Sequence, residues 1–123
     1  IFLNSGKFKP VIEYNEVSNS SVILICVPTP LFENNLTDLS AVESAAKEVA
    51  KHLSKNSLVI MESTVAPGTT RDFLVPILEQ GSGLNSEDFY VAFSPERIDP
   101  LNKNWNVKNT PKIVLIHKNS CKL

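Results

Sequence analysis

Three polar segments carry the side chains best suited to chemistry, and each begins where a short apolar run ends. Thr29, Thr64 and Glu96 lie at or near the start of these segments. A carboxylate can take up or return a proton at a reacting group, and a hydroxyl can hold or relay one. An apolar run that breaks into a Pro- or Gly-marked loop is typical of a buried parallel strand, and ligands bind at the carboxyl ends of such strands. The three residues are therefore predicted to face one crevice at one edge of a parallel sheet.

The first two segments also have purely structural explanations. The prolines around Thr29 stop a strand and turn the hydroxyl outward, but they could equally do no more than end the strand. Ser63 and Thr64 begin a strand-to-helix turn that can present backbone N–H groups to an anion or a ribose. Hydroxyl residues also cap helices where no ligand binds. Glu62 is either an orienting carboxylate or a solvated strand end.

The third segment contains the strongest acid/base candidate. Glu96 is expected to sit in a cleft that raises its pKa, and Arg97 can hold a phosphate or carboxylate through two parallel hydrogen bonds. The two side chains could instead pair with each other or with solvent. Cys26 is expected to be a small buried apolar residue rather than a nucleophile. No set of His, Cys and Asp residues has metal-ligand spacing, so no metal is expected.

Strands and helices must alternate to position these groups. Continuous apolar runs without period-two alternation predict strands buried on both faces, at 22–27, Leu58–Met61, 89–93 and 113–116. Their order with the intervening helices predicts an α/β fold, a partial Rossmann-like (doubly wound) parallel sheet with flanking helices. The dinucleotide fingerprint G-x-G-x-x-G does not occur in the 123 residues.

Two helices are predicted between the strands. The first begins near Asp38 and has an apolar stripe at helical spacing: Val42, Ala45, Ala46, Val49, Ala50 and Leu53. The second runs over 70–79, with Thr69 or Thr70 as its cap and an end at the glycines of 81–83. Pro76 lies in its middle and is expected to kink it.

Composition excludes several classes of partner. Twelve basic and thirteen acidic residues give a net charge of −1, without the basic surface that nucleic acid or an anionic membrane attracts. No apolar stretch approaches the roughly 20 residues of a membrane span. The first residues do not form a signal peptide, and two cysteines make no disulfide framework. A reducing cytoplasm is the expected location.

Taken together, the motifs resemble the nucleotide-sugar dehydrogenases of the UDP-glucose/GDP-mannose dehydrogenase family, roughly from Phe8 to Val114. The resemblance is carried by the segments 26–30, 38–42, 62–70, 93–100 and 105–112. The form Ser-Pro-Glu-Arg-Ile-Asp-Pro at 94–100 is closer to the branch that acts on UDP-N-acetylhexosamines than to the UDP-glucose branch.

The resemblance implies an NAD-dependent, four-electron oxidation of a sugar 6-hydroxyl to a carboxylate, through an enzyme-bound aldehyde and a Cys thioester. It implies NAD contacts for Val27, Pro28, Thr29, Ser63 and Thr64. It implies acid/base or water-positioning roles for Glu96 with Thr64, and substrate contacts for Glu96, Arg97 and Ile98. The implied partner is a small-molecule UDP-sugar, with a homo-oligomeric full-length parent.

Departures from the family pattern lead us to expect a fragment. Leu101 stands where the family usually has Gly, and Thr37 where a Pro is common; neither Cys26 nor Cys121 matches the family nucleophile. Residues 1–123 are expected to form a single partial NAD-binding domain, its second half, with a tail at 115–123 that departs from the family. The chain alone is expected to be inactive. The alternative is a non-catalytic Rossmann-like module that binds a nucleotide weakly, or a fold remnant with no ligand.

Overall fold

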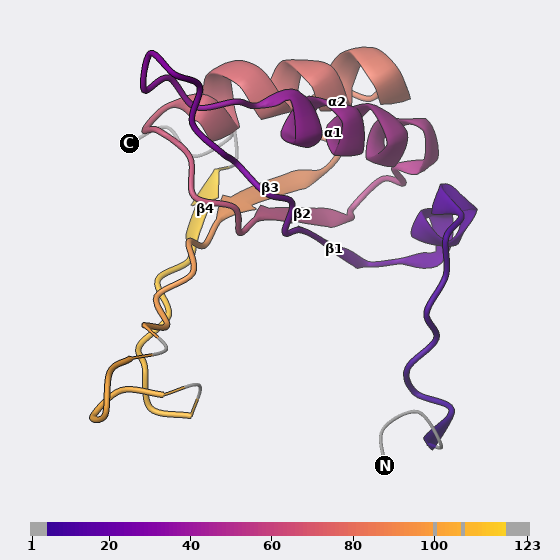
Figure 1. The fold of residues 1–123 in the computed structure, drawn as a ribbon. Helices are drawn as coiled ribbons and strands as arrows, with labels where there is room; N and C mark the ends of the chain where they lie inside the picture. The colour runs from indigo at the N-terminus through magenta and orange to yellow at the C-terminus, as the bar shows by residue number, and fades with distance from the viewer. Residues whose placement is uncertain (1–4, 100, 107, 118–123) are drawn as a thin grey trace.

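A four-stranded sheet with two helices on one face forms the centre of the protein (Figure 1). The computed structural model describes residues 5–99, 101–106 and 108–117. The strands follow one another in the sheet in chain order: β1 Val22–Ile25, β2 Leu58–Met61, β3 Tyr90–Phe93 and β4 Leu115–His117. The helical elements are a 3-10 helix Tyr14–Asn19, α1 Ser40–His52, a π-helical turn Thr70–Leu74 and α2 Val75–Ser82.

The first three strands are parallel, as predicted. Val59 at the centre of β2 is in register with Ile23 of β1 and with Val91 of β3, and all three side chains are buried. Since the strands run in one direction, their carboxyl ends meet at one edge of the sheet. The loops that follow β1, β2 and β3 therefore leave the sheet beside one another.

The fourth strand runs antiparallel to β3, so the prediction of a parallel fourth strand was wrong. Ala92 of β3 is in register with Ile116 of β4. A parallel return needs a crossover, usually a helix. The β3–β4 loop, residues 94–114, has no helix among its described residues. It leaves the sheet and comes back to the same edge (Figure 1).

Burial on both faces of the sheet was also predicted, and for β1 this was wrong. Ile23 and Ile25 are buried, whereas Val22 and Leu24 are 49% and 52% exposed. The cause is the placement of α1 and α2 on the same side of the sheet (Figure 1). Among the described residues, β1 therefore has one covered face and one open face, although its sequence is apolar throughout.

The first helix follows its predicted pattern closely. It begins at Ser40, whose backbone N–H donates to Oδ1 of Asp38 at 2.9 Å. Its predicted stripe is buried from Val42 to Ala50 and packs on the sheet and on α2. The contact with α2 is close: a Cβ added to Gly81 would lie 2.6 Å from the Cβ of Ala50. A glycine is thus needed in α2 where it crosses α1.

The second helix deviates where Pro76 was expected to disturb it. Pro76 is the second residue of α2, and the turn before it is π-helical. A proline has no N–H for the helical ladder, and a wider π turn is one way to accommodate such a gap. Neither Thr69 nor Thr70 caps the helix with its side chain. The helix ends as predicted, at Gly83 with a left-handed φ of 70°.

Candidate functional site

The carboxyl ends of the parallel strands enclose a hollow of about 350 Å³, here called the carboxyl-edge hollow. Its walls come from the loops after β1, β2 and β3: Cys26, Val27, Pro28, Thr29, Glu62, Ser63, Thr64 and Glu96. The structure therefore brings Thr29, Thr64 and Glu96 to one place, although they are widely separated in the sequence. Seven of the eight lining residues belong to the first two loops, and Glu96 is the contribution of the third.

Two hydroxyls fasten the first loop to the second. Thr29 donates from Oγ1 to the backbone oxygen of Thr64 at 2.9 Å, and Ser63 donates from Oγ to the backbone oxygen of Val27 at 2.6 Å. Ser63 is buried, so its hydroxyl serves the fold. The hydroxyl of Thr64 is exposed and has no partner among the described residues. It is the hydroxyl of this pair of loops that is open to a ligand.

Glu96 does not have the environment predicted for it. It is exposed, and its Oε1 accepts the backbone N–H groups of Ile98 at 2.8 Å and Arg97 at 2.6 Å. These hydrogen bonds stabilise the carboxylate and lower its pKa, with a smaller contribution from the positive charge of Lys112. The prediction of a raised pKa was wrong because the carboxyl is solvated and hydrogen-bonded rather than desolvated.

Arg97 and Ile98 lie apart from the carboxyl-edge hollow. Arg97 lines a separate hollow, also of about 350 Å³, with Trp105 and other residues of the β3–β4 loop. Its guanidinium has no ion-pair partner among the described residues, so it does not pair with Glu96. Ile98 is partly buried and contributes its backbone N–H to Glu96. The structure thus puts Arg97, the residue predicted to bind a phosphate or carboxylate, in a separate hollow and not in the carboxyl-edge hollow.

Cys26 corrects another prediction. It lies beyond the end of β1 and is exposed, with its Sγ 3.4 Å from Oε2 of Glu62. Partial burial raises the pKa of the thiol, and the neighbouring Glu62 raises it further. The thiol therefore stays protonated near neutral pH and is a poor nucleophile. The predicted lack of reactivity is consistent with this, but the predicted burial was wrong, since the strand ends earlier than its apolar run.

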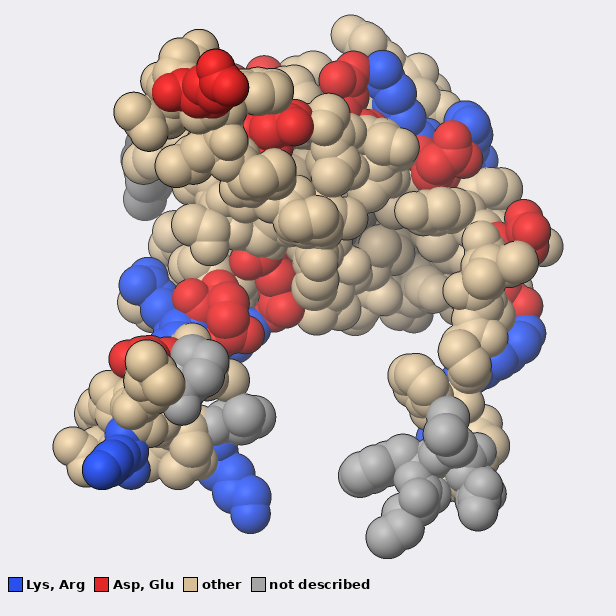
Figure 2. Space-filling view, in the orientation of Figure 1, with Lys and Arg blue, Asp and Glu red and all other residues tan. Residues whose placement is uncertain are grey.

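One contact at this edge was missed from the sequence. The ammonium of Lys112, near the end of the β3–β4 loop, forms an ion pair with Oε1 of Glu62. Glu62 is thus an oriented carboxylate rather than a solvated strand end. The side chains in Figure 2 show acidic and basic groups together where the β3–β4 loop leaves the sheet. The partners are 50 positions apart, and no local pattern signals such a pair.

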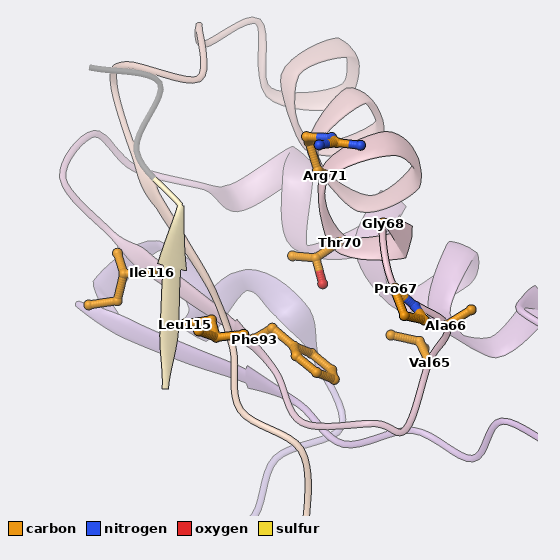
Figure 3. Close-up of a pocket in the computed structure, with 9 residues that line it drawn as sticks. All are labelled: Val65, Ala66, Pro67, Gly68, Thr70, Arg71, Phe93, Leu115 and Ile116. Carbon is orange, nitrogen blue, oxygen red and sulfur yellow. The ribbon is translucent and has the colours of Figure 1, made fainter. Parts of the chain in front are cut away.

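A larger hollow lies on the helix side of the sheet and is mostly apolar. It measures about 450 Å³ and is lined by residues 65–68, Thr70 and Arg71, with Phe93, Leu115 and Ile116 opposite. Figure 3 shows Thr70 turned toward this space and Arg71 turned away from it. Arg71 pairs with Asp72 at 2.6 Å. None of Thr29, Thr64 and Glu96 reaches this hollow, so it is not the place for the acid/base chemistry considered above.

Two other kinds of site find no support in the part of the chain that the structure describes. Over residues 5–99, 101–106 and 108–117, no three His, Cys, Asp or Glu residues are grouped so that they could hold a metal ion. Within the same ranges, no helix has both the length and the apolar character that crossing a membrane requires. Cys121 lies outside the described residues.

Several known proteins are similar to this chain in sequence and in fold. The family model "UDP-glucose/GDP-mannose dehydrogenase family, NAD binding domain" matches residues 2–122. UDP-N-acetyl-D-glucosamine 6-dehydrogenase of Pseudomonas aeruginosa is 40% identical over 99 residues, which are 80% of this chain and 24% of that protein. GDP-mannose 6-dehydrogenase of Pseudomonas putida is 33% identical over 97 residues, 75% of this chain and 22% of that protein.

A solved structure extends the likeness to three dimensions. The UDP-D-ManNAc dehydrogenase of Pyrococcus horikoshii superposes with a TM-score of 0.74 at 42% identity, covering 80% of this chain and 23% of that one. The chain thus spans about a quarter of the length of the relatives it matches. The matched domain is the one that binds NAD. The chain belongs to the UDP-glucose/GDP-mannose dehydrogenase family, and the part of that family it represents is the NAD binding domain.

Proposed function

We propose that this chain supplies one wall of the cofactor and reaction site of a nucleotide-sugar dehydrogenase. The proposed reaction is the NAD-dependent oxidation of the 6-hydroxyl of a UDP-N-acetylhexosamine to a carboxylate. The observation that carries the proposal is the meeting of Thr29, Thr64 and Glu96 at the carboxyl-edge hollow. This is the edge of an α/β sheet at which ligands bind. Relatives named for UDP-N-acetyl-D-glucosamine and UDP-N-acetyl-D-mannosamine support the substrate class.

The loops after β1 and β2 suit one side of a dinucleotide. Thr64 offers an exposed hydroxyl with no partner among the residues that the structure describes, and the oxygen of Thr29 can still accept a hydrogen bond while its proton is donated. Val27 and Pro28 line the same hollow with apolar surface. We assign Ser63 the task of shaping the loop, because its hydroxyl is used internally. These loops would hold NAD, which would supply the hydride acceptor for the oxidation.

Glu96 is suited to act as a base. Its lowered pKa keeps it ionised at neutral pH, so the carboxylate can orient a water molecule and accept a proton from it as the water reacts, whereas a protonated acid would be scarce. The same shift makes Glu96 a weaker base than an ordinary carboxylate, which favours the water-orienting role. Thr64 lines the same hollow as Glu96, and its hydroxyl can relay or hold a proton there. The guanidinium of Arg97 lines the separate hollow with Trp105, has no ion-pair partner among the described residues, and can hold a phosphate of the nucleotide.

A segment exchange tests this function directly. The 99-residue stretch of the Pseudomonas aeruginosa enzyme that aligns with this chain would be replaced by the corresponding residues of this chain. NADH formation at 340 nm would be followed with UDP-N-acetylglucosamine, UDP-N-acetylmannosamine, UDP-glucose and GDP-mannose. We expect turnover with a UDP-N-acetylhexosamine. A chimera that folds and binds NAD but reduces none of it with any of the four would overturn the proposal and favour a non-catalytic module.

The 123-residue chain by itself is the negative control for this assay. Its sequence contains no glycine-rich phosphate loop, and its one described thiol is held protonated beside Glu62. We therefore expect no NADH formation by the purified chain with any of these substrates. Steady-state NADH production by this chain, free of the host enzyme, would contradict the proposal that the chain supplies only one wall of the reaction site.

A further inference from the structure

Lys112 joins two parts of the chain that meet only at the carboxyl edge. Its ammonium contacts Oε1 of Glu62, the first residue after β2, across 50 positions of sequence. The Glu62 side chain is only 18% exposed, and the Lys112 side chain 45%. A carboxylate that is mostly covered needs a partner, because water no longer solvates it fully. The ion pair, here called the Lys112–Glu62 tie, therefore holds the β3–β4 loop to the end of β2 as well as neutralising the Glu62 carboxylate.

The tie closes a long loop on which Glu96 lies. Glu96 is near the start of the β3–β4 loop and Lys112 is near its end. The described part of that loop contains no helix or strand, and two of its large apolar residues, Leu101 and Trp105, are 90% and 50% exposed. Its return to the sheet rests on the short strand β4 and on the pair with Glu62. The pair is a side-chain link between the first residue after β2 and the β3–β4 loop.

The same ammonium lies near two carboxylates, those of Glu62 and Glu96. Glu62 holds the thiol of Cys26 through Oε2 at 3.4 Å, and Glu96 lines the same hollow. The pKa of Glu96 is lowered mainly by the backbone N–H groups of Ile98 and Arg97, and the charge of Lys112 lowers it a little further. The same charge favours the thiolate of Cys26, whose pKa is nevertheless raised by burial and by Glu62. The carboxylate of Glu62 in turn raises the pKa of Lys112. This part of the carboxyl edge thus combines two carboxylates, one thiol and one ammonium.

We propose that Lys112 is a positioning residue for the chemistry at the carboxyl-edge hollow. Through Glu62 it fixes the returning end of the β3–β4 loop to the end of β2, and its charge offsets the two carboxylates that face the hollow. Lys112 acts through Glu62 and Glu96 and need not touch a substrate. The catalytic significance of Glu96 rests on the proposed function, whereas the positioning itself is a property of this chain and is tested without turnover.

The test compares Lys112→Met with Lys112→Arg in the 123-residue chain. Side-chain carboxyl signals of ¹³C-labelled glutamate would be followed by NMR over a pH titration, with amide signals reporting the fold. We expect Lys112→Met to raise the titration midpoint of Glu96 and Lys112→Arg to keep it near the wild-type position. Amides of β4 should exchange roughly twofold to fivefold faster in Lys112→Met, the range for ion pairs of modest strength.

Two further variants make the result specific. Lys55→Met removes an ion pair with Asp88 at 3.0 Å, on the amino side of the strands, and should leave Glu96 unchanged. Glu62→Met removes the acceptor at the other end of the same ion pair. It should also speed exchange in β4, which keeps the test decisive if Lys112→Met fails to fold. An unaltered Glu96 midpoint in folded Lys112→Met, or unaltered β4 exchange in Glu62→Met, would overturn the proposal. Neither outcome depends on the chimera.

Discussion

The carboxylate of Glu96 illustrates how a local hydrogen-bond pattern decides a role. Two backbone N–H groups point at one of its oxygens, so the group is ionised at neutral pH and fixed in direction. An amide oxygen accepts hydrogen bonds in the same way. Replacement of Glu96 by Gln therefore preserves the turn and removes only the charge and the basicity. This makes Glu96 a good position at which to separate chemistry from folding.

Glu96→Gln in the chimeric enzyme should lower turnover by about 10²–10⁴-fold, the usual contribution of general acid–base assistance. If Glu96 orients the water of the second half-reaction, single-turnover experiments should show a burst of NADH and then a stalled intermediate. Glu87→Gln makes the same change in charge at an exposed site just before β3 and should leave turnover intact. Normal turnover in Glu96→Gln would reject the catalytic role and leave the family membership untouched.

Elements with a complete local signal were predictable, and those that depend on partners were not. The stripe from Val42 to Ala50 specifies α1 by its period alone, and three apolar runs specify β1, β2 and β3. The direction of β4 depends on the route of the β3–β4 loop, which its irregular sequence does not encode. The burial of β1 depends on which faces the helices cover. Likewise the convergence of Thr29, Thr64 and Glu96 follows from strand order. The lowered pKa of Glu96 comes mainly from the turn at 96–98, whose backbone N–H groups meet the carboxylate, whereas the position of Lys112 depends on tertiary geometry.

The crossing of α1 and α2 gives a prediction at the scale of elements. In an isolated helix Gly81→Ala would be stabilising by about 1 kcal/mol. Here the new Cβ would lie 2.6 Å from the Cβ of Ala50, so the helices must separate. Overpacking of this kind costs about 1–3 kcal/mol. We expect a net loss in the free energy of unfolding, measured by urea denaturation.

The double variant Ala50→Gly with Gly81→Ala supplies the control. The double variant restores the space at the crossing. Its loss in the free energy of unfolding should therefore be smaller than the sum of the losses in the two single variants. An increase in stability for Gly81→Ala alone would show that the helices do not cross as closely as described.

For the molecule as a whole, ionisable groups stabilise the fold over a limited range of pH. Hydrogen bonds or ion pairs lower the pKa of Asp38, Asp72, Asp88 and Glu96. At the other end of the scale, contacts with carboxylates raise the pKa of Lys112 and Arg71. A group with a lowered folded-state pKa stabilises the fold above its unfolded pKa and loses this effect as the pH falls. A group with a raised pKa stabilises it below its unfolded pKa and loses the effect as the pH rises.

The acid side of this balance yields the last prediction. Below the ordinary carboxyl range of about 4, the unfolded chain binds more protons than the folded chain, so the free energy of unfolding should fall with the pH. Urea denaturation at a series of pH values from neutral to acidic would measure this slope. In Asp88→Asn the pair with Lys55 is lost. That variant should be less stable than wild type at neutral pH and should approach wild type in acid, where Asp88 is protonated in both states. A difference between the two proteins that stays constant or grows on acidification would mean that Asp88 stabilises the fold by something other than its charge.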